Sequence, residues 1–202
     1  MVPDIEAIPE AEREYYERFM CVQHNNPGRV DYGRDVLFEL ISQKSGAQMS
    51  GNFDRECLPR IGALLGRLDE MVESCSGQAK AVFVDLRDRV RAYLYWCTAL
   101  RNVCAWVADV HGYLEATEDA SRHSHEENLQ RTIDAEIENT RGLLELFENS
   151  STEFMALSGV GDSTFLYGEN FGDLLRRKLS LISEYRHHAP FIDRDILWRV
   201  KQ

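Results

Sequence analysis

The sequence predicts an all-α protein. Apolar residues recur with the 3.6-residue period of a helix through most of the 202-residue chain, and no stretch alternates with the period of two that marks a strand. Short connections between these amphipathic stretches favour antiparallel neighbours. We therefore expect one domain, a helical bundle of about four long helices plus shorter flanking helices. Its expected parts are N-terminal helices (1–78), a long central helix with its antiparallel partner (79–149), a glycine-rich aromatic loop (150–170) and basic C-terminal helices (171–202).

The N-terminal part predicts three helices. Pro9 opens the first, which runs to about Gln23, because proline is tolerated in a first helical turn. The second spans about Tyr32 to Gln43, and KSGAQMSGN (residues 44–52) is predicted to be a loop. Pro59 stands at the start of the third helix. Its expected apolar side consists of Leu58, Ile61, Leu64, Leu65, Leu68, Met71, Val72 and Cys75.

A long central helix follows. Gly77 is expected to end the preceding helix, and from Ala79 to about Thr117 no residue breaks the helical pattern, which at 1.5 Å per residue gives a length of about 58 Å. Between Ala92 and Leu114, 17 of 23 residues are apolar, so other helices should enclose this one. No membrane span is expected, because charged side chains within this stretch would have to enter hydrocarbon.

Two further long helices are predicted. Ser124 and Glu127 have the spacing of a capping box, so the partner of the central helix should begin near His125. After the glycine-rich segment, a helix runs from Phe171 to HHAP (residues 187–190). A last short helical turn is predicted at residues 193–200.

Charge and cysteine usage limit the partners and the compartment. The net charge of −11 disfavours nucleic acid and anionic membranes, which require a positive field. Residues 171–202 hold seven basic and four acidic side chains, so this end should form a local positive patch. Five scattered cysteines are expected to be reduced thiols, and the acidic N-terminus does not resemble a secretory signal. We expect a cytoplasmic protein.

Polar residues on the central helix are the best candidates for a site. Thr98, Asn102 and Asp109 fall within about 40° of one another around the helix axis, and Arg101 and His111 lie on neighbouring faces. Two interpretations are open for them. They can make interhelical hydrogen bonds or border a narrow solvent strip. Alternatively they line a ligand pocket, in which Asp109 serves as a base or holds a cation and Arg101 holds a carboxylate.

Metal and catalytic motifs are weak. A di-iron bundle needs two Glu-x-x-His pairs, and the chain has one, Glu184 with His187. His123 and His125 are expected to be surface residues. No motif identifies a catalytic nucleophile, so the catalytic residues stay unassigned and no cofactor is predicted.

The segment SGVGDSTFLYGENFGDLLRRKL (residues 158–179) is unusual for a connection between helices. It lacks the preceding strand and the correctly placed lysine of a phosphate loop. Its aromatic side chains either pack back on the bundle or form a docking or gating loop. The residues of that candidate loop are Asp162, Ser163, Phe165, Tyr167, Asn170 and Phe171.

Taken together, these patterns predict a cytosolic interaction protein, an accessory or structural subunit that forms a homo-oligomer or binds a protein partner. The alternative is an enzyme or small-molecule sensor with a polar-lined pocket inside the bundle. A metal-dependent helical bundle is a third hypothesis.

Overall fold

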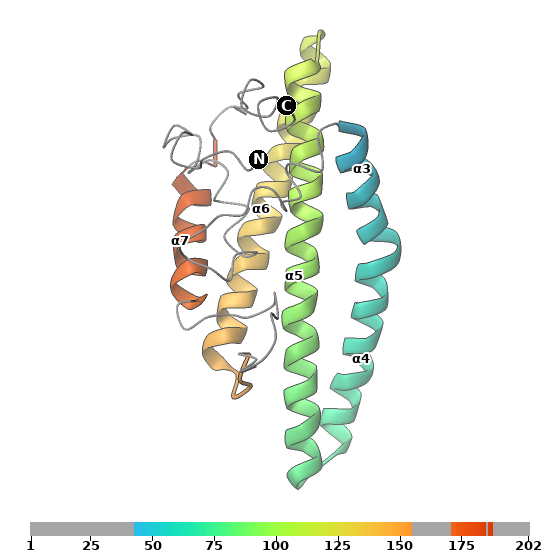
Figure 1. Cartoon of the computed structure of the whole chain (residues 1–202), viewed down its shortest axis with the longest axis vertical. Helices are drawn as coiled ribbons and strands as arrows, with labels where there is room; N and C mark the ends of the chain where they lie inside the picture. The colour runs from blue at the N-terminus through green and yellow to red at the C-terminus, as the bar shows by residue number, and fades with distance from the viewer. Residues whose placement is uncertain (1–42, 155–170, 185, 188–202) are drawn as a thin grey trace, which may run out of the picture.

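The structure is a computed structural model that describes residues 43–154, 171–184 and 186–187. The predicted all-α fold is confirmed: these residues are almost entirely helical, and no strand occurs among them (Figure 1). The helices predicted at 9–23 and 193–200 lie outside the described residues, and so does the helix predicted at about 32–43 except for Gln43. The elements are α3 (Gln43–Asn52), the π-helix η3 (Phe53–Cys57), α4 (Leu58–Ser74), α5 (Gly77–Glu115), α6 (Asp119–Asn149) and α7 (Phe171–Glu184).

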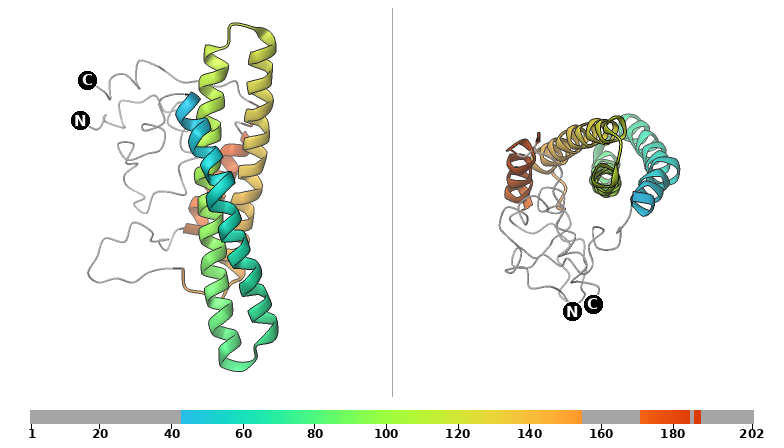
Figure 2. Two further views of the ribbon diagram at one scale, coloured as in Figure 1. Left: turned by 90° about the vertical axis from the view of Figure 1, so that its right-hand side faces the viewer. Right: turned by 90° about the horizontal axis from the view of Figure 1, so that it is seen from above.

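The long helix α5 organises the bundle. It packs against α6 on one side and against α3 and α4 on another, and α7 packs against α6 (Figure 1). Seen from above in Figure 2, α7, α6 and the rod formed by α3 and α4 make an arc on one side of α5. None of the described helices is long and apolar enough to cross a membrane.

The segment predicted to be a loop, residues 44–52, is helical, so that prediction was wrong. It lies in α3, which continues through η3 into α4 as one bent rod (Figure 1). The reason is tertiary packing. A Cβ atom on Gly46 would lie 2.6 Å from the backbone oxygen of Cys104, so the glycine lets α3 lie directly on α5. Burial against α5 offsets the low helix propensity of this glycine- and serine-rich segment.

Pro59 explains the π-helix. It lacks an N–H group, and its ring excludes the carbonyl four residues earlier, so a regular helical hydrogen bond cannot form there. The N–H of Leu58 bonds instead to the carbonyl of Phe53, five residues back. The extra residue in this turn sets the orientation of Asp54 and Cys57 relative to α5.

Two predicted helix starts are corrected. Gly77 begins α5 with a φ of +60°, a conformation that glycine adopts readily, whereas it was expected only to end α4. Helix α6 begins at Asp119, so Ser124 and Glu127 lie inside it and form no capping box. The capping spacing was misleading because helix-forming residues continue on its N-terminal side.

The apolar side predicted for α4 is only partly buried. Leu65, Leu68 and Val72 are in the core, but Leu64 and Met71 are 44% and 42% exposed. These two side chains lie on the flank of the helix that α5 does not cover.

Helix α7 is fixed to α6 by an apolar cluster and by a buried ion pair. Phe171 and Leu175 pack with Leu143 of α6, and the rings of Phe171 and Phe147 meet edge to face with centroids 5.4 Å apart. The ammonium group of Lys178 donates to the carboxylate of Glu136, and neither side chain is exposed.

Candidate functional site

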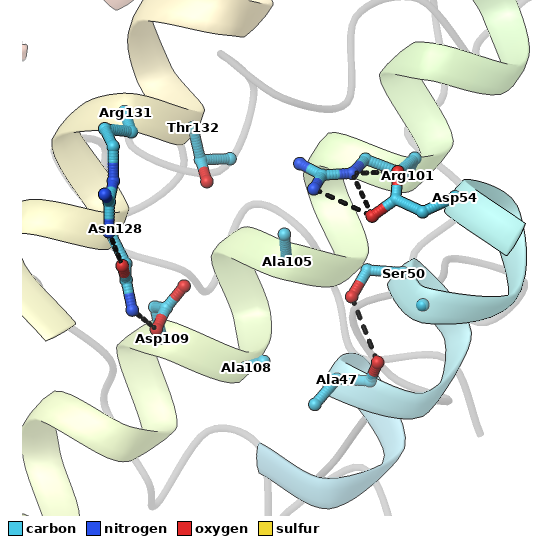
Figure 3. Close-up of a pocket in the computed structure, with 11 residues that line it drawn as sticks. Ala47, Ser50, Asp54, Arg101, Ala105, Ala108, Asp109, Asn128, Arg131 and Thr132 are labelled. Atoms are coloured by element: carbon cyan, nitrogen blue, oxygen red, sulfur yellow. Dashed lines mark hydrogen bonds and ion pairs between the residues drawn. The ribbon is translucent and has the colours of Figure 1, made fainter. Parts of the chain in front are cut away.

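A pocket of about 480 Å³ opens between α3, α5 and α6 (Figure 3). Its lining residues recur at i, i+3, i+4 and i+7 spacings, so each helix contributes one face. Ala105 and Ala108 of α5 form the middle of the pocket, and charged groups lie at its two ends. The other lining residues are Ala47, Ser50, Gly51 and Asp54 from the rod, Arg101 and Asp109 from α5, and Asn128, Arg131 and Thr132 from α6.

The Arg101 end of the pocket is a closed ion pair. Nε and Nη2 of Arg101 each donate to the carboxylate of Asp54, at 3.0 Å. Such a two-point contact between a guanidinium and a carboxylate is geometrically specific and strong. The remaining nitrogen, Nη1, lies 3.4 Å from Oδ1 of Asn102. The π-helix therefore presents Asp54 to α5, and the two charges neutralise each other.

The Asp109 end of the pocket is open. Oδ1 of Asp109 accepts hydrogen bonds from Nδ1 of His125 at 2.9 Å and from Nδ2 of Asn128 at 3.1 Å. Among the described residues, the second oxygen, Oδ2, has no hydrogen-bond partner, and in Figure 3 it points away from Asn128. The side chain is only 17% exposed, so this carboxylate is held in place at the pocket wall.

A guanidinium lies beside this carboxylate. Arg131 donates to Oδ1 of Asn128, whose amide nitrogen donates to Asp109, so one asparagine connects the cation to the anion (Figure 3). Arg131 is exposed, and its Nε and Nη1 bond to none of the described residues. The Asp109 end thus offers an acceptor and a cationic donor next to each other, together with the hydroxyl of Thr132.

In comparisons with protein families, with curated proteins and with solved structures, nothing matches this chain. Its function must therefore be argued from the site itself.

Only some of the five candidate site residues predicted on α5 line the pocket. Arg101 and Asp109 line the pocket. Thr98 donates to the backbone oxygen of Leu94 in its own helix, 2.9 Å away. Asn102 is 1% exposed and donates to Oε2 of Glu136 at 2.7 Å, so it belongs to the buried network and not to the pocket wall. His111 is buried and is not among the lining residues.

Asn102 connects the pocket to the buried ion pair. It accepts from Arg101 and donates to Glu136, which also accepts from Thr140 and Lys178. The polar contacts therefore run from η3 through α5 and α6 to α7.

The predicted docking loop is described only at its end. Phe171 is 3% exposed and packs in the core, so it is not part of a docking surface. The other members of that loop, Asp162, Ser163, Phe165, Tyr167 and Asn170, lie outside the described residues.

The predicted positive patch is largely neutralised where it is described. Arg176, Lys178 and Arg186 pair with carboxylates of α6, which are Glu148, Glu136 and Asp134 respectively. These contacts attach α7 to α6 and leave fewer basic groups for a partner.

The described residues contain no group of three or more histidine, cysteine, aspartate or glutamate side chains placed to hold a metal ion. Glu184 and His187 are exposed, and Nδ1 of His187 lies 3.1 Å from the side-chain oxygen of Gln130. His123 is on the surface as expected, whereas the side chain of His125 is only 18% exposed and pairs with Asp109.

Two walls of the pocket were missed by sequence reasoning. The α3 wall was missed because its residues were predicted to be a loop. The α6 wall has a signal in the sequence, since Asn128, Arg131 and Thr132 share one helical face, but nothing in a single sequence shows that this face meets Asp109.

Proposed function

We propose that this protein binds a small polar molecule in the pocket between α3, α5 and α6. The observation that supports this is the convergence of polar side chains from three helices on one pocket of about 480 Å³. Ligand sites are typically concave, of a few hundred Å³, with a small number of placed polar groups. The function is that of a sensor or binding subunit, because the lining residues that the structure describes include no nucleophile and base in contact.

The composition of the pocket wall favours a polar ligand over an apolar one. Among the described lining residues, its apolar part consists of three alanines and a glycine, with no aromatic or large aliphatic side chain. Such a wall gains little from hydrophobic burial, so affinity must come from hydrogen bonds and charge.

A ligand screen with a blocked pocket tests this proposal. Thermal unfolding is measured with a panel of amines, carboxylic acids, amino acids, sugars, phosphates and nucleosides. At least one compound should raise the melting temperature, because a ligand that binds only the native state stabilises it. Ala105→Phe fills the pocket and should abolish the shift. Ala63→Phe, on the exposed surface of α4, should preserve it. A panel without any shift, or a shift unaffected by Ala105→Phe, contradicts the proposal.

A second function is favoured by a separate surface, which we call the hairpin face. Leu64 and Met71 of α4 and Val82, Leu86 and Tyr93 of α5 are 42–60% exposed. Helical periodicity places all five on the side of the α4–α5 pair opposite the ion pairs of Asp69 with Arg87 and Arg91. In Figure 1 this pair extends beyond the end of α6.

We propose that a second copy of the chain covers the hairpin face. Charges of both signs border it, as in the ion pairs Arg89–Asp85 and Arg60–Glu56, and a two-fold interface requires a self-complementary surface. Light scattering should then show a dimer that Leu86→Glu converts to a monomer. Met49→Glu, at an exposed apolar residue of α3, should leave the dimer intact. A monomeric wild-type protein at high concentration contradicts self-association and leaves the ligand proposal unaffected.

A further inference from the structure

The polar groups of the pocket differ in how completely they are satisfied. At the Arg101 end, Asp54 and Arg101 neutralise each other through two hydrogen bonds of 3.0 Å. A ligand would have to break this pair to use either charge. Because an ion pair with good geometry is strongly directional, the Arg101 end is better suited to bordering a ligand than to holding its charged group.

At the Asp109 end, one carboxylate oxygen is available. Asn128 and His125 both bond to Oδ1 and fix the plane of the carboxylate, while Oδ2 has no partner among the described residues. The Asp109 side chain is 17% exposed, but Oδ2 is not among the buried polar atoms that lack a partner, so a molecule in the pocket can reach it. A positively charged donor gives a carboxylate oxygen its strongest hydrogen bond. Oδ2 of Asp109 is therefore suited to a ligand ammonium group.

The neighbouring cation is suited to a ligand anion. Arg131 is separated from Asp109 by the single side chain of Asn128, and its Nε and Nη1 are not engaged by described residues. These N–H groups can donate charge-assisted hydrogen bonds to a carboxylate. A ligand that carries an ammonium and a carboxylate group close together can therefore contact both side chains.

We infer that the pocket binds a free α-amino acid, with its ammonium group on Oδ2 of Asp109 and its carboxylate on Arg131. This inference rests on the proposed function and specifies its ligand class. The ligand side chain extends over Ala105 and Ala108 toward Ser50 and the Arg101–Asp54 pair. The volume of about 480 Å³ leaves room for such a side chain, and the small residues along the path do not restrict its shape.

Calorimetric titration with the 20 common L-amino acids tests the inference. At least one should bind, and two analogues of that amino acid measure each contact. Its amide lacks the carboxylate, and its 2-hydroxy analogue lacks the ammonium group. Each analogue should bind at least about tenfold more weakly, because a charge-assisted hydrogen bond contributes about 1.5 to 3 kcal/mol.

Matched variants locate the binding site. Asp109→Asn and Arg131→Gln keep the size of the side chain and should each weaken binding at least about tenfold. Arg131→Gln should also reduce the difference in affinity between the amino acid and its amide. Arg141→Gln is the control, since Arg141 lies on the exposed side of α6 and pairs with Glu138. Circular dichroism verifies that each variant is folded, and Arg131→Gln tests the site if Asp109→Asn does not fold.

The outcomes separate this inference from the proposed function. Binding of another class of compound that Ala105→Phe abolishes, without amino-acid binding, overturns the inference and supports the broader proposal. Equal affinity of the amino acid and both analogues, or equal loss with Arg141→Gln, also overturns it. A panel in which nothing binds overturns both.

Discussion

Lys178 of α7 and Glu136 of α6 form an ion pair in which both side chains are fully buried. The carboxylate also accepts from Asn102 of α5 at 2.7 Å and from Thr140 at 3.3 Å, so three helices meet at one charge. Removing a charge from water is costly, and the attraction between the partners and these extra hydrogen bonds offsets that penalty. The network therefore sets the position of α7 on α6.

The first prediction concerns this pair. Lys178→Met leaves an unpaired buried carboxylate and should lower the free energy of unfolding by about 3 to 5 kcal/mol. Urea denaturation measures the change. Arg176→Met removes an exposed cation of the same helix and should change stability by less than about 1 kcal/mol. Adding Glu136→Gln to Lys178→Met should recover part of the loss. If Lys178→Met and Arg176→Met lowered the free energy of unfolding equally, the buried pair would contribute no more to stability than an exposed one.

The second prediction concerns the contact between α3 and α5. Gly46→Ala places a methyl group 2.6 Å from a backbone oxygen of α5, so the helices must separate and stability should fall by about 1 to 3 kcal/mol. In Gly62→Ala the new methyl group meets nothing within 4 Å. That substitution should stabilise the protein by about 0.4 to 1 kcal/mol, because alanine has less freedom in the unfolded chain. Thermal unfolding of both variants gives the comparison, and two changes of the same sign would contradict the close packing.

The third prediction concerns the thiols. Burial raises the pKa of Cys97 and of Cys104 to about 12, so neither forms the reactive thiolate near neutral pH. Iodoacetamide at pH 8, followed by peptide mass spectrometry, should modify the partly exposed Cys57 and Cys75 first. In urea all four should react. Rapid modification of Cys104 in the native protein would exclude its burial.

The same thiols predict the direction of an alkaline effect. In the unfolded chain a cysteine loses its proton at about pH 8.5, whereas the buried thiols keep theirs up to about pH 12. Above the unfolded-state pKa the unfolded chain therefore binds fewer protons, and stability falls as pH rises. Replacing Cys97 and Cys104 with alanine should reduce the slope of unfolding free energy against pH between 9 and 11. An unchanged slope would show that other groups cause it.

The fourth prediction concerns the end of α6. Ser150 donates its hydroxyl to the carboxylate of Asp88 at 2.6 Å and accepts the N–H of Thr152 at 3.0 Å. Asp88 is 4% exposed, so Ser150→Ala should destabilise the protein by about 1 to 3 kcal/mol. Ser74→Ala removes a hydroxyl whose bond to Met71 is exposed, and it should be nearly neutral in the same denaturation assay. If Ser150→Ala and Ser74→Ala changed the free energy of unfolding by similar amounts, the hydrogen bond from Ser150 to Asp88 would not be an important source of stability.

Part of this structure follows from local pattern alone. Leu129, Ile133 and Ile137 recur at helical spacing and are buried along one face of α6. Arg101 and Asp109 are noticeable in the sequence because they interrupt an otherwise apolar helix, and both line the pocket. The spacing of apolar residues along the chain is enough to predict which face of a helix is buried and that the chain forms helices and not strands.

The other features of the structure depend on contacts between helices, which local sequence does not reveal. The α3 wall of the pocket depends on the approach of Gly46 to α5, which overrides a local sequence that favours a loop. Lys178 belongs to a basic run in the sequence, yet its partner Glu136 is on another helix. Periodicity determines which residues share a face of one helix. The distance and rotation between helices determine which polar groups meet, and those depend on packing across the whole bundle.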